Sequence, residues 1–419
     1  MGYSWSPYPR YHLYASSASY GVPLRRLGFK PGMGNCISQL ESDICRRFDV
    51  AAAVCVPMAR TGLYLALKEL IQPGQRVVMS PLTIIDVVNM VLLAGGIPVF
   101  ADVLKSSCAI DPDEAESLID NRTGAILITH LHGETAGAYI FREISRRRGV
   151  PLIEDAAQAF GGEENERRLG AIGDVGIYSF GFYKNLSTWQ GGMLVSQNPA
   201  IIARIRERIS PWRTLSSLQL LMLSLRGLMT DIATSPPVFA MFLHPVVRYC
   251  CLHNIKQVNR RLDPEDRARR ILRMPARYLH RMSDAQAEIA LHNIGSLDDD
   301  MAMRVAHAVL YHDALAGMEG LITPRKHTGR SHIYSYYPIQ CSHRDALLRY
   351  AQQRRRDFAA QHLRNCADLP EFREFHRDCP NARAVARELI LLPTYPRYPE
   401  TEIRRNIEVI QAFLRTWKR

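Results

Sequence analysis

Asp155, Ser179 and Lys184 bring a carboxylate, a hydroxyl and an amine close together in the sequence. An apolar run at 150–154 precedes Asp155, and a second run at 175–180 contains Ser179 and leads to Lys184. A lysine amine can condense with an aldehyde, and a carboxylate can keep a pyridine nitrogen protonated. Pyridoxal 5′-phosphate (PLP) needs both groups, and the Ser179 hydroxyl could donate to its phosphate.

Each of these residues also has an ordinary structural explanation. A lysine after a strand is usually solvated, and an aspartate after a strand commonly caps a helix. The chemical interpretation therefore depends on the elements that position the three side chains.

The segments up to residue 196 alternate between apolar strands and helices, which predicts a mainly parallel sheet. Functional residues of such sheets gather at the carboxyl ends of the strands, where Asp155 and Lys184 would meet. A strand at 51–56 leads through MARTGL (58–63) into a helix from about Thr61. A helix N-terminus after a loop of small residues suits a phosphate, because its N–H groups lack partners.

The stretch from Glu154 to Ser196 resembles the core signature of the DegT/StrS-type sugar aminotransferases, a branch of the fold-type I PLP enzymes. The segments EDAAQAFG (154–161), LGAIGDVGIYSFGFYKNL (169–186) and GGMLVS (191–196) follow that signature almost continuously. The resemblance implies that Lys184 is the Schiff-base lysine and that Asp155 pairs with the ring nitrogen. It also implies that Gln158 contacts the oxygen side of the ring and that Ser179 binds the phosphate.

The sequence departs from this family at several cofactor positions. Ala59 replaces a glycine of the phosphate loop, in which Arg60 and Thr61 are expected to bind phosphate. Ile84 replaces an aromatic residue that lies on the PLP ring, which forfeits a contact worth about 1 kcal/mol. Leu279 stands where an asparagine reaches the neighbouring subunit's cofactor, a contact that Arg60 could replace.

The resemblance covers residues 34–210 and 275–415 and implies an α/β fold of the fold-type I class. We expect a mainly parallel, seven-stranded-type sheet in a large domain (34–280) and a smaller α/β C-terminal domain (281–419). Residues 1–33 are predicted to form an irregular arm, and residues 331–340 a strand. The family also implies a homodimer.

An apolar insert is expected at about 213–262. Within it, residues 215–252 carry only Arg226, Asp231 and Arg248 as charges, and Pro236-Pro237 divides two apolar segments. Each segment is shorter than the ~20 residues of a spanning helix, so a hairpin in the membrane interface is expected rather than two crossings. The basic run 256–270 would then meet lipid headgroups. The alternative is packing on the protein itself or across a subunit interface.

Composition narrows the remaining classes. The net charge is +12, yet the arginine clusters lack nucleic-acid motifs, so we expect no nucleic-acid partner. The nine cysteines show no CxxC spacing, and His130 and His132 lack further ligands, so neither a disulfide framework nor a metal site is expected. His130 to Gly133 resembles a family HxxG and is expected in the wall of the site. Without a predicted secretory signal, we expect a cytoplasmic location, or one at the inner face of the membrane.

The resemblance implies transfer of an amino group from an amino acid, with glutamate as donor, to a keto group of a nucleotide-linked sugar. Some relatives are dehydratases with histidine in place of the lysine, and Lys184 argues for transamination. Two alternatives stay open. One is a PLP enzyme acting on a lipid or lipid-linked substrate at the membrane, and the other is a non-catalytic membrane-associated protein that keeps the PLP fold.

Overall fold

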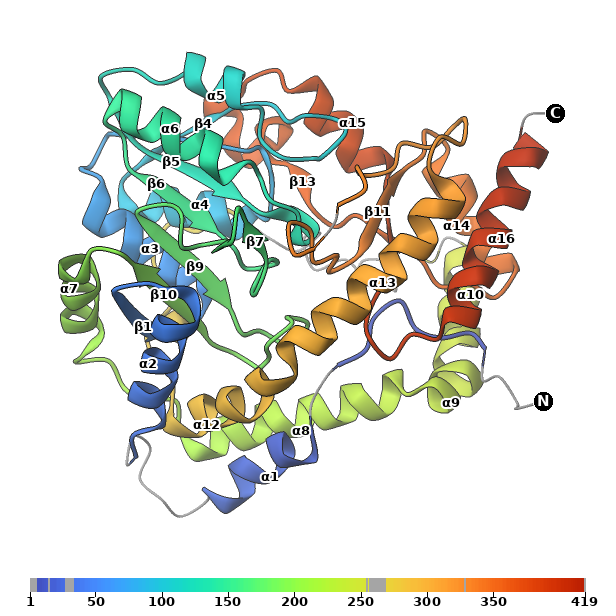
Figure 1. Cartoon of the computed structure of the whole chain (residues 1–419), viewed down its shortest axis with the longest axis horizontal. Coiled ribbons are helices and arrows are strands. Elements are labelled where there is room, and N and C mark those ends of the chain that lie inside the picture. Colours follow the sequence, from blue (N-terminus) through green and yellow to red (C-terminus); the bar gives the residue numbers. More distant parts are fainter. Residues whose placement is uncertain are drawn as a thin grey trace.

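The computed structural model describes residues 6–13, 16–26, 34–253, 255, 269–327 and 329–417. Most of the predicted basic run 256–270 lies outside these residues. The fold is built around a large twisted sheet with helices on both faces, and a smaller α/β part packs beside it (Figure 1).

The large sheet is seven-stranded and mainly parallel, which confirms the predicted fold class. Its strands, in spatial order, are β1 (Ala52–Val56), β10 (Gly192–Ser196), β9 (Val175–Ser179), β6 (Leu152–Asp155), β5 (Thr123–Thr129), β2 (Arg76–Met79) and β4 (Ile97–Phe100). Only β10 runs antiparallel to its neighbours in this sheet. The carboxyl ends of β1, β9, β6, β5 and β2 therefore meet at one edge.

Both faces of the sheet are buried, because alternate residues of each strand point to opposite sides. Val54 and Val56 pack with α3 (Ala59–Leu70), α4 (Ile85–Ala94) and α7 (Pro199–Ile209). Ala53 and Cys55 face the other side, which is covered by α2 (Cys36–Phe48), α6 (Ala138–Arg148) and α12 (Asp284–Asn293). Burial on two faces explains why the strands read as continuous apolar runs.

The smaller part contains an antiparallel sheet in the order β11 (Tyr337–Gln340), β14 (Leu389–Leu392) and β12 (Ala359–Ala360). Three helices share its core: α13 (Leu297–Leu315), α14 (Arg344–Gln353) and α16 (Glu400–Trp417). The predicted strand 331–340 forms only over its last four residues. Residues 331–335 instead exchange backbone hydrogen bonds with the loop at 132–135 of the large part.

Short elements connect these units. They are α5 (Pro112–Ser117), α15 (Pro380–Glu388), the pair β3 (Leu82–Thr83) and β13 (Arg364–Asn365), and the pair β7 (Glu163–Glu164) and β8 (Arg167–Arg168). The β3–β13 pair joins the region after β2 to the C-terminal third of the chain.

The N-terminal region is not entirely irregular, and that expectation is wrong for α1 (Ser17–Arg25). The Ser16 side chain caps this helix by accepting from the backbone N–H of Ser19. Val22 is fully buried in a small cluster with Trp189 and Ile289. Packing of α1 against α12 and against α8 (Ser217–Thr234) therefore outweighs the low helix propensity of Gly21 and Pro23.

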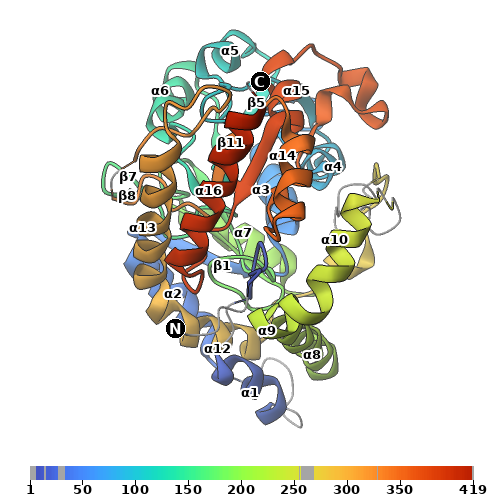
Figure 2. The same cartoon turned by 90° about the vertical axis from the view of Figure 1, so that its right-hand side faces the viewer.

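The apolar segment folds as α8 (Ser217–Thr234), α9 (Pro236–Val238), a π-helical turn at Phe239–Leu243, and α10 (His244–Leu252). Figure 1 and Figure 2 show α8 along the lower edge of the molecule and α10 rising from its far end towards α14, both outside the large sheet. Leu220, Ser224 and Gly227 are buried on the inner face of α8. Among the described residues, no helix has the length and hydropathy needed to cross a bilayer.

Candidate active site

Lys184 and Asp155 lie close enough to influence each other electrostatically at the carboxyl edge of the sheet. Asp155 ends β6, and Lys184 sits in a turn after β9, where its N–H donates to Gly181 O at 3.1 Å. Burial lowers the pKa of the Lys184 amine, the Asp155 carboxylate opposes this, and the Arg60 charge adds to it. The net effect lowers the pKa, which increases the share of the neutral amine, the nucleophilic form.

The Asp155 carboxyl is held by few groups. Its Oδ1 accepts from the Ala157 N–H at 3.0 Å. Burial raises the pKa of Asp155, whereas the Ala157 N–H and the charges of Lys184 and His130 act in the opposite direction. A cation placed against this carboxylate would relieve the cost of its burial.

Ser179 lies at the end of β9, between these groups and the start of α3. Gly192 pairs with Ser179 on one side and with Val56 on the other, so Ser179 and the turn before α3 flank one strand. A Cβ added to Gly192 would lie 2.9 Å from Ala59 N. The glycine thus allows the N-terminus of α3 to approach the sheet edge.

Arg60 and Thr61 are both engaged with the segment around Tyr278. The Arg60 guanidinium pairs with Asp86, donates to Tyr278 Oη at 3.2 Å and lies 5.5 Å from the centre of the Tyr278 ring. The fully buried Thr61 donates through Oγ1 to Tyr278 O at 3.3 Å. The helix start has no side-chain cap at Met58, which leaves its first N–H groups for another acceptor.

Gln158 is fixed at the junction of the two parts. Its Oε1 accepts from the His132 N–H at 3.0 Å, and its backbone O accepts from Ser335 Oγ at 2.7 Å. His132 is buried, and burial, with the charge of His362, lowers its pKa to about 3. The bond between Gln158 and Ser335 joins the large part to the residues that precede β11.

His130 lies behind the site rather than in its lining. The Ala136 N–H donates to Nδ1 at 3.0 Å, so the ring proton is on Nε2, which donates to Glu154 Oε2 at 3.0 Å. Glu154 also accepts the N–H groups of Gly170, Ile172 and Gly173. His130 therefore supports the strand that carries Asp155.

Ile84 and Leu279 occupy the two positions at which the sequence departs from the resembled family. Ile84 is half-buried at the residue before α4 and packs against the core of that face. Leu279 ends a 3₁₀ turn at Ala276–Tyr278, where its N–H donates to Ala276 O at 3.0 Å. Neither side chain offers a polar group to a cofactor.

The pocket that contains Lys184 also contains residues that the sequence did not reveal. Its wall is formed by the loop after β9, by the arm and by the smaller part. These residues are Phe182, Tyr183, Lys184 and Asn185, then Tyr11 and His12, and finally Arg304, Ser335, Tyr336 and Tyr395. Asn185 directly follows Lys184, and this position beside the predicted lysine was the one sequence signal that could have identified it. The buried Asn185 Nδ2 has no hydrogen-bond partner among the described residues.

The described residues fit PLP. No described residue makes a hydrogen bond to the Lys184 amine, and Asp155 Oδ2 likewise lacks a donor. The Ser179 hydroxyl only accepts a long contact of 3.5 Å from the Gly181 N–H. An amine, a carboxylate oxygen and a hydroxyl are thus available for an aldehyde, a ring cation and a phosphate.

Comparisons with known proteins identify the family and the fold. A sequence profile of the DegT/DnrJ/EryC1/StrS aminotransferase family matches residues 30–233 and 246–411. The spore coat polysaccharide biosynthesis protein SpsC of Bacillus subtilis (strain 168) is 26% identical over 396 residues, covering 91% of this chain and 90% of that protein.

Solved structures show the same fold. The sugar aminotransferase CalS13 from Micromonospora echinospora superposes with a TM-score of 0.76 at 20% identity, covering 97% of this chain and 100% of its own. The E. coli GDP-4-keto-6-deoxy-D-mannose-3-dehydratase with bound hydrated PLP gives 0.75 at 16% identity, covering 96% and 99%.

The profile match leaves parts of the chain uncovered. The unmatched internal stretch is 234–245, which lies within the insert expected at about 213–262. Residues 1–29, which include Tyr11 and His12 of the pocket, precede the match.

Proposed function

Because the chain belongs to the DegT/DnrJ/EryC1/StrS family of PLP-dependent aminotransferases, we propose that it binds PLP and transfers an amino group from glutamate to a nucleotide-linked keto-sugar. The observation that carries this proposal is the placement of Lys184, in the turn after β9, and of Asp155, at the end of β6, at one edge of the sheet, where each charge acts on the other.

The chain's own residues would divide the work at this site. Bound PLP supplies an aldehyde that captures amines and a ring that withdraws electrons. The Lys184 amine would attach the cofactor and later move protons at the reacting carbon. Asp155 would hold the proton on the ring nitrogen, and Ser179 with the first N–H groups of α3 would bind the phosphate.

An anionic donor is favoured by the charge of the pocket. Arg304 lines it, and the guanidinium is largely buried while its Nη1 donates to Ser335 O at 3.2 Å. A buried cation near the Lys184 amine favours a substrate with carboxylates. Glutamate fits this requirement.

A sugar acceptor is favoured by the relatives and by the retained lysine. SpsC is named for polysaccharide biosynthesis, and the E. coli dehydratase is named for a GDP-linked keto-sugar. Lys184 favours transamination over dehydration, since the resembled dehydratases carry histidine at this position.

Two half-reactions test the proposal. Protein loaded with PLP should lose its visible cofactor absorbance on addition of glutamate and recover it on addition of a nucleotide-linked keto-sugar. The variant Lys184→Ala should show neither change. A wild-type protein that takes up no PLP would contradict the proposal and favour a non-catalytic role.

We also propose the homodimer that the family implies. Leu279 removes one expected contact across the subunit boundary, and Arg60 could substitute for it through its charge. Sedimentation equilibrium should give a dimer, and Arg60→Ala should weaken PLP retention. A monomer that retains PLP fully in both forms would contradict these two expectations.

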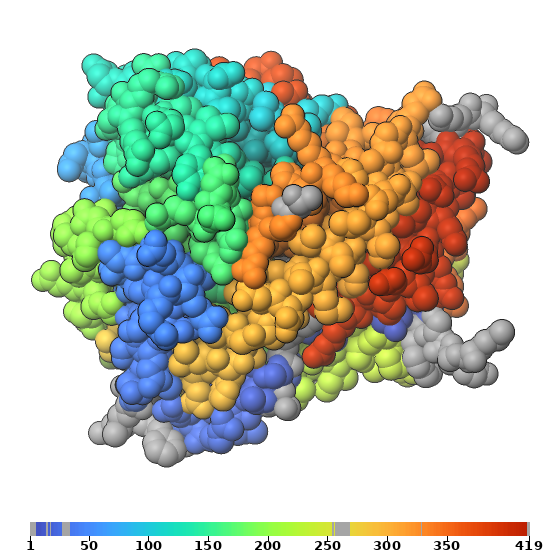
Figure 3. Space-filling view, in the orientation of Figure 1, coloured from blue at the N-terminus to red at the C-terminus, as the bar shows by residue number. Residues whose placement is uncertain are grey.

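A second candidate function, action on a lipid-linked substrate at a membrane surface, is favoured by the outer face of α8 to α10. The surface of α8 is open along the lower edge of the molecule (Figure 3). Met229 is 71% exposed, Phe242 66% and Leu218 65%, and these side chains belong to one continuous apolar segment. Such a face fits a peripheral contact with lipid.

Vesicle flotation tests this contact. Wild-type protein should float with vesicles that contain anionic lipid, and Phe242→Asp should reduce the bound fraction. Ile140→Asp is the matched control, because Ile140 is 55% exposed on α6, away from this segment. No flotation of the wild type, or equal binding by both variants, would refute the membrane contact.

A further inference from the structure

The N-terminal arm reaches the Lys184 pocket. In Figure 1 it runs between α13 and α8, beside the turn that precedes α16. Tyr11 and His12 form part of the pocket wall. The Tyr11 ring meets the ring of Tyr183, the neighbour of Lys184, edge to face at 4.7 Å between centroids.

Contacts with the smaller part fix the arm on one side of the pocket. The Arg10 N–H donates to Asp357 Oδ2 at 3.0 Å, and its Nε donates to Asp357 Oδ1 at 3.0 Å. Tyr395 Oη donates to Pro9 O at 3.0 Å, and Leu13 is 1% exposed. The hydrogen bonds hold the backbone before Tyr11, and the burial of Leu13 holds it after Tyr11.

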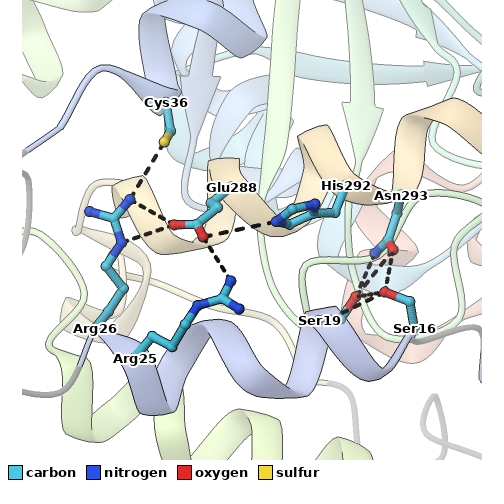
Figure 4. A network of polar contacts seen from close by, with 8 residues as sticks. All are labelled: Ser16, Ser19, Arg25, Arg26, Cys36, Glu288, His292 and Asn293. Atoms are coloured by element: carbon cyan, nitrogen blue, oxygen red, sulfur yellow. Dashed lines mark hydrogen bonds and ion pairs between the residues drawn. The ribbon is translucent and has the colours of Figure 1, made fainter.

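A second anchor lies further along the arm, in α1. Figure 4 shows α1 tied to α12 by two groups of polar contacts. Glu288 pairs with Arg25 at 3.1 Å and with Arg26 at 2.6 Å. Asn293 exchanges hydrogen bonds with Ser19 at 3.0 and 3.1 Å. The arm is therefore held at both ends and not only at its contact with the pocket.

His12 connects the arm to the unusual helix α8. Its Nδ1 lies 2.8 Å from Thr234 Oγ1, and its Nε2 lies 3.2 Å from Asp231 Oδ1. Thr234 is the first residue of the internal stretch that the family profile does not match, so two unmatched segments of the chain meet beside the pocket.

The chemistry of this wall suits a sugar ring. Tyr11, Tyr336 and Tyr395 combine apolar ring surfaces with hydroxyl groups, which match the C–H face and the hydroxyls of a hexose. Asn185 adds a buried amide donor that lacks a partner among the described residues. A buried donor of this kind is stabilised when a ligand oxygen accepts from it.

We propose that Tyr11 and His12 are specificity-determining residues that contact the sugar ring of the keto-sugar acceptor, with Asn185 as a neighbouring donor. His12 would contact the sugar through its ring face, because both ring nitrogens are engaged with α8. This inference rests on the proposed function. It assigns contact with the acceptor to residues 11 and 12, which precede the match to the family profile, and binding of the donor to Arg304.

The test separates the two half-reactions in full-length, PLP-loaded protein. Glutamate is the donor probe, and GDP-4-keto-6-deoxymannose with other nucleotide-linked keto-hexoses form the acceptor panel. In Tyr11→Phe and His12→Gln, the acceptor KM should rise at least fivefold or the preference within the panel should change. The rate with glutamate should stay within twofold of wild type.

Tyr8→Phe is the matched control. Tyr8 lies on the same arm and packs on Tyr398 at 5.9 Å, outside the pocket wall. It should leave both half-reactions unchanged. Thermal denaturation confirms that the variants fold, and Tyr11→Ala provides a stronger change if the hydroxyl alone has a small effect.

Three results would overturn the inference. Unchanged acceptor kinetics and preference in Tyr11→Ala and His12→Gln would remove the proposed contact. Equal losses with glutamate and with acceptor would indicate a general positioning role. A wild type that reacts with glutamate but with no member of the panel would refute the keto-sugar and this inference together, whereas no reaction with glutamate would refute the proposed function first.

Discussion

Replacing Gly192 with alanine should move Ser179 and the N-terminus of α3 apart, and these two groups form the predicted phosphate site. The new Cβ would lie 2.6 Å from Tyr178 O, 2.9 Å from Ala59 N and 3.1 Å from the carbonyl carbon of Met58. All three are backbone atoms, so no side-chain rotation relieves the contacts.

The size of the effect follows from these distances. An ordinary contact needs about 3.4 Å or more, so the start of α3 must move from β10 by roughly half an ångström, the tolerance of a binding site. Overpacking of this kind costs about 1–3 kcal/mol of folding stability. We expect PLP affinity to fall about tenfold or more, because the α3 N–H groups and Ser179 would no longer share one acceptor.

Gly96→Ala is the matched control. Its Cβ would meet Ile71 Cδ1 at 2.8 Å and Val77 Cγ2 at 3.2 Å, at the amino end of β4. It should lower the free energy of unfolding by less than Gly192→Ala, because these side chains can shift, and it should leave PLP binding unchanged. The assays are thermal denaturation and titration of the cofactor-free protein with PLP. If Gly192→Ala binds PLP as tightly as Gly96→Ala, the assignment of the phosphate site is wrong.

Three further changes test other contacts. Asp155→Asn should lower the pKa of Lys184 further, because the opposing carboxylate is lost. Competitive labelling of lysine amines in the cofactor-free protein should then modify Lys184 faster at pH 8. An unchanged labelling rate would contradict the electrostatic effect of Asp155 on Lys184. Glu154→Gln should cost about 1–3 kcal/mol at pH 7. Burial acts to raise the pKa of Glu154, but hydrogen bonds bring it below its ordinary value. The stabilisation by Glu154 should therefore be complete above about pH 5 and decline as the solution is acidified through the pKa of the folded state. A pH-independent difference in stability between wild type and variant would refute this prediction. Arg10→Ala should cost about 3–5 kcal/mol in denaturant unfolding, because Asp357 stays buried without its partner, and a loss below about 1 kcal/mol would show that the arm is not anchored there.

The sequence predicted the parallel sheet and the placement of Asp155 and Lys184 at its edge, because local patterns determine both. Apolar runs bounded by glycine specify the strands, and Asp155 and Lys184 follow two of them directly. The parallel order then places both residues at one edge without knowledge of long-range contacts.

Other features depend on contacts that local patterns do not encode. Gly21 and Pro23 argue against a helix, and α1 forms because Val22 is buried beneath neighbouring helices. Tyr11 reaches the pocket through an arm fixed by Asp357 and Tyr395, which are more than three hundred residues away in the chain. Such contacts emerge only when the two parts of the fold pack together.

The attachment of PLP to Lys184 tests the account most directly. Protein incubated with PLP, reduced with borohydride and digested should yield a pyridoxyl group on the peptide that contains Lys184, and this adduct should be absent from Lys184→Ala. A reduced wild-type protein in which Lys184 is unmodified, or in which surface lysines are labelled equally, would contradict the central claim.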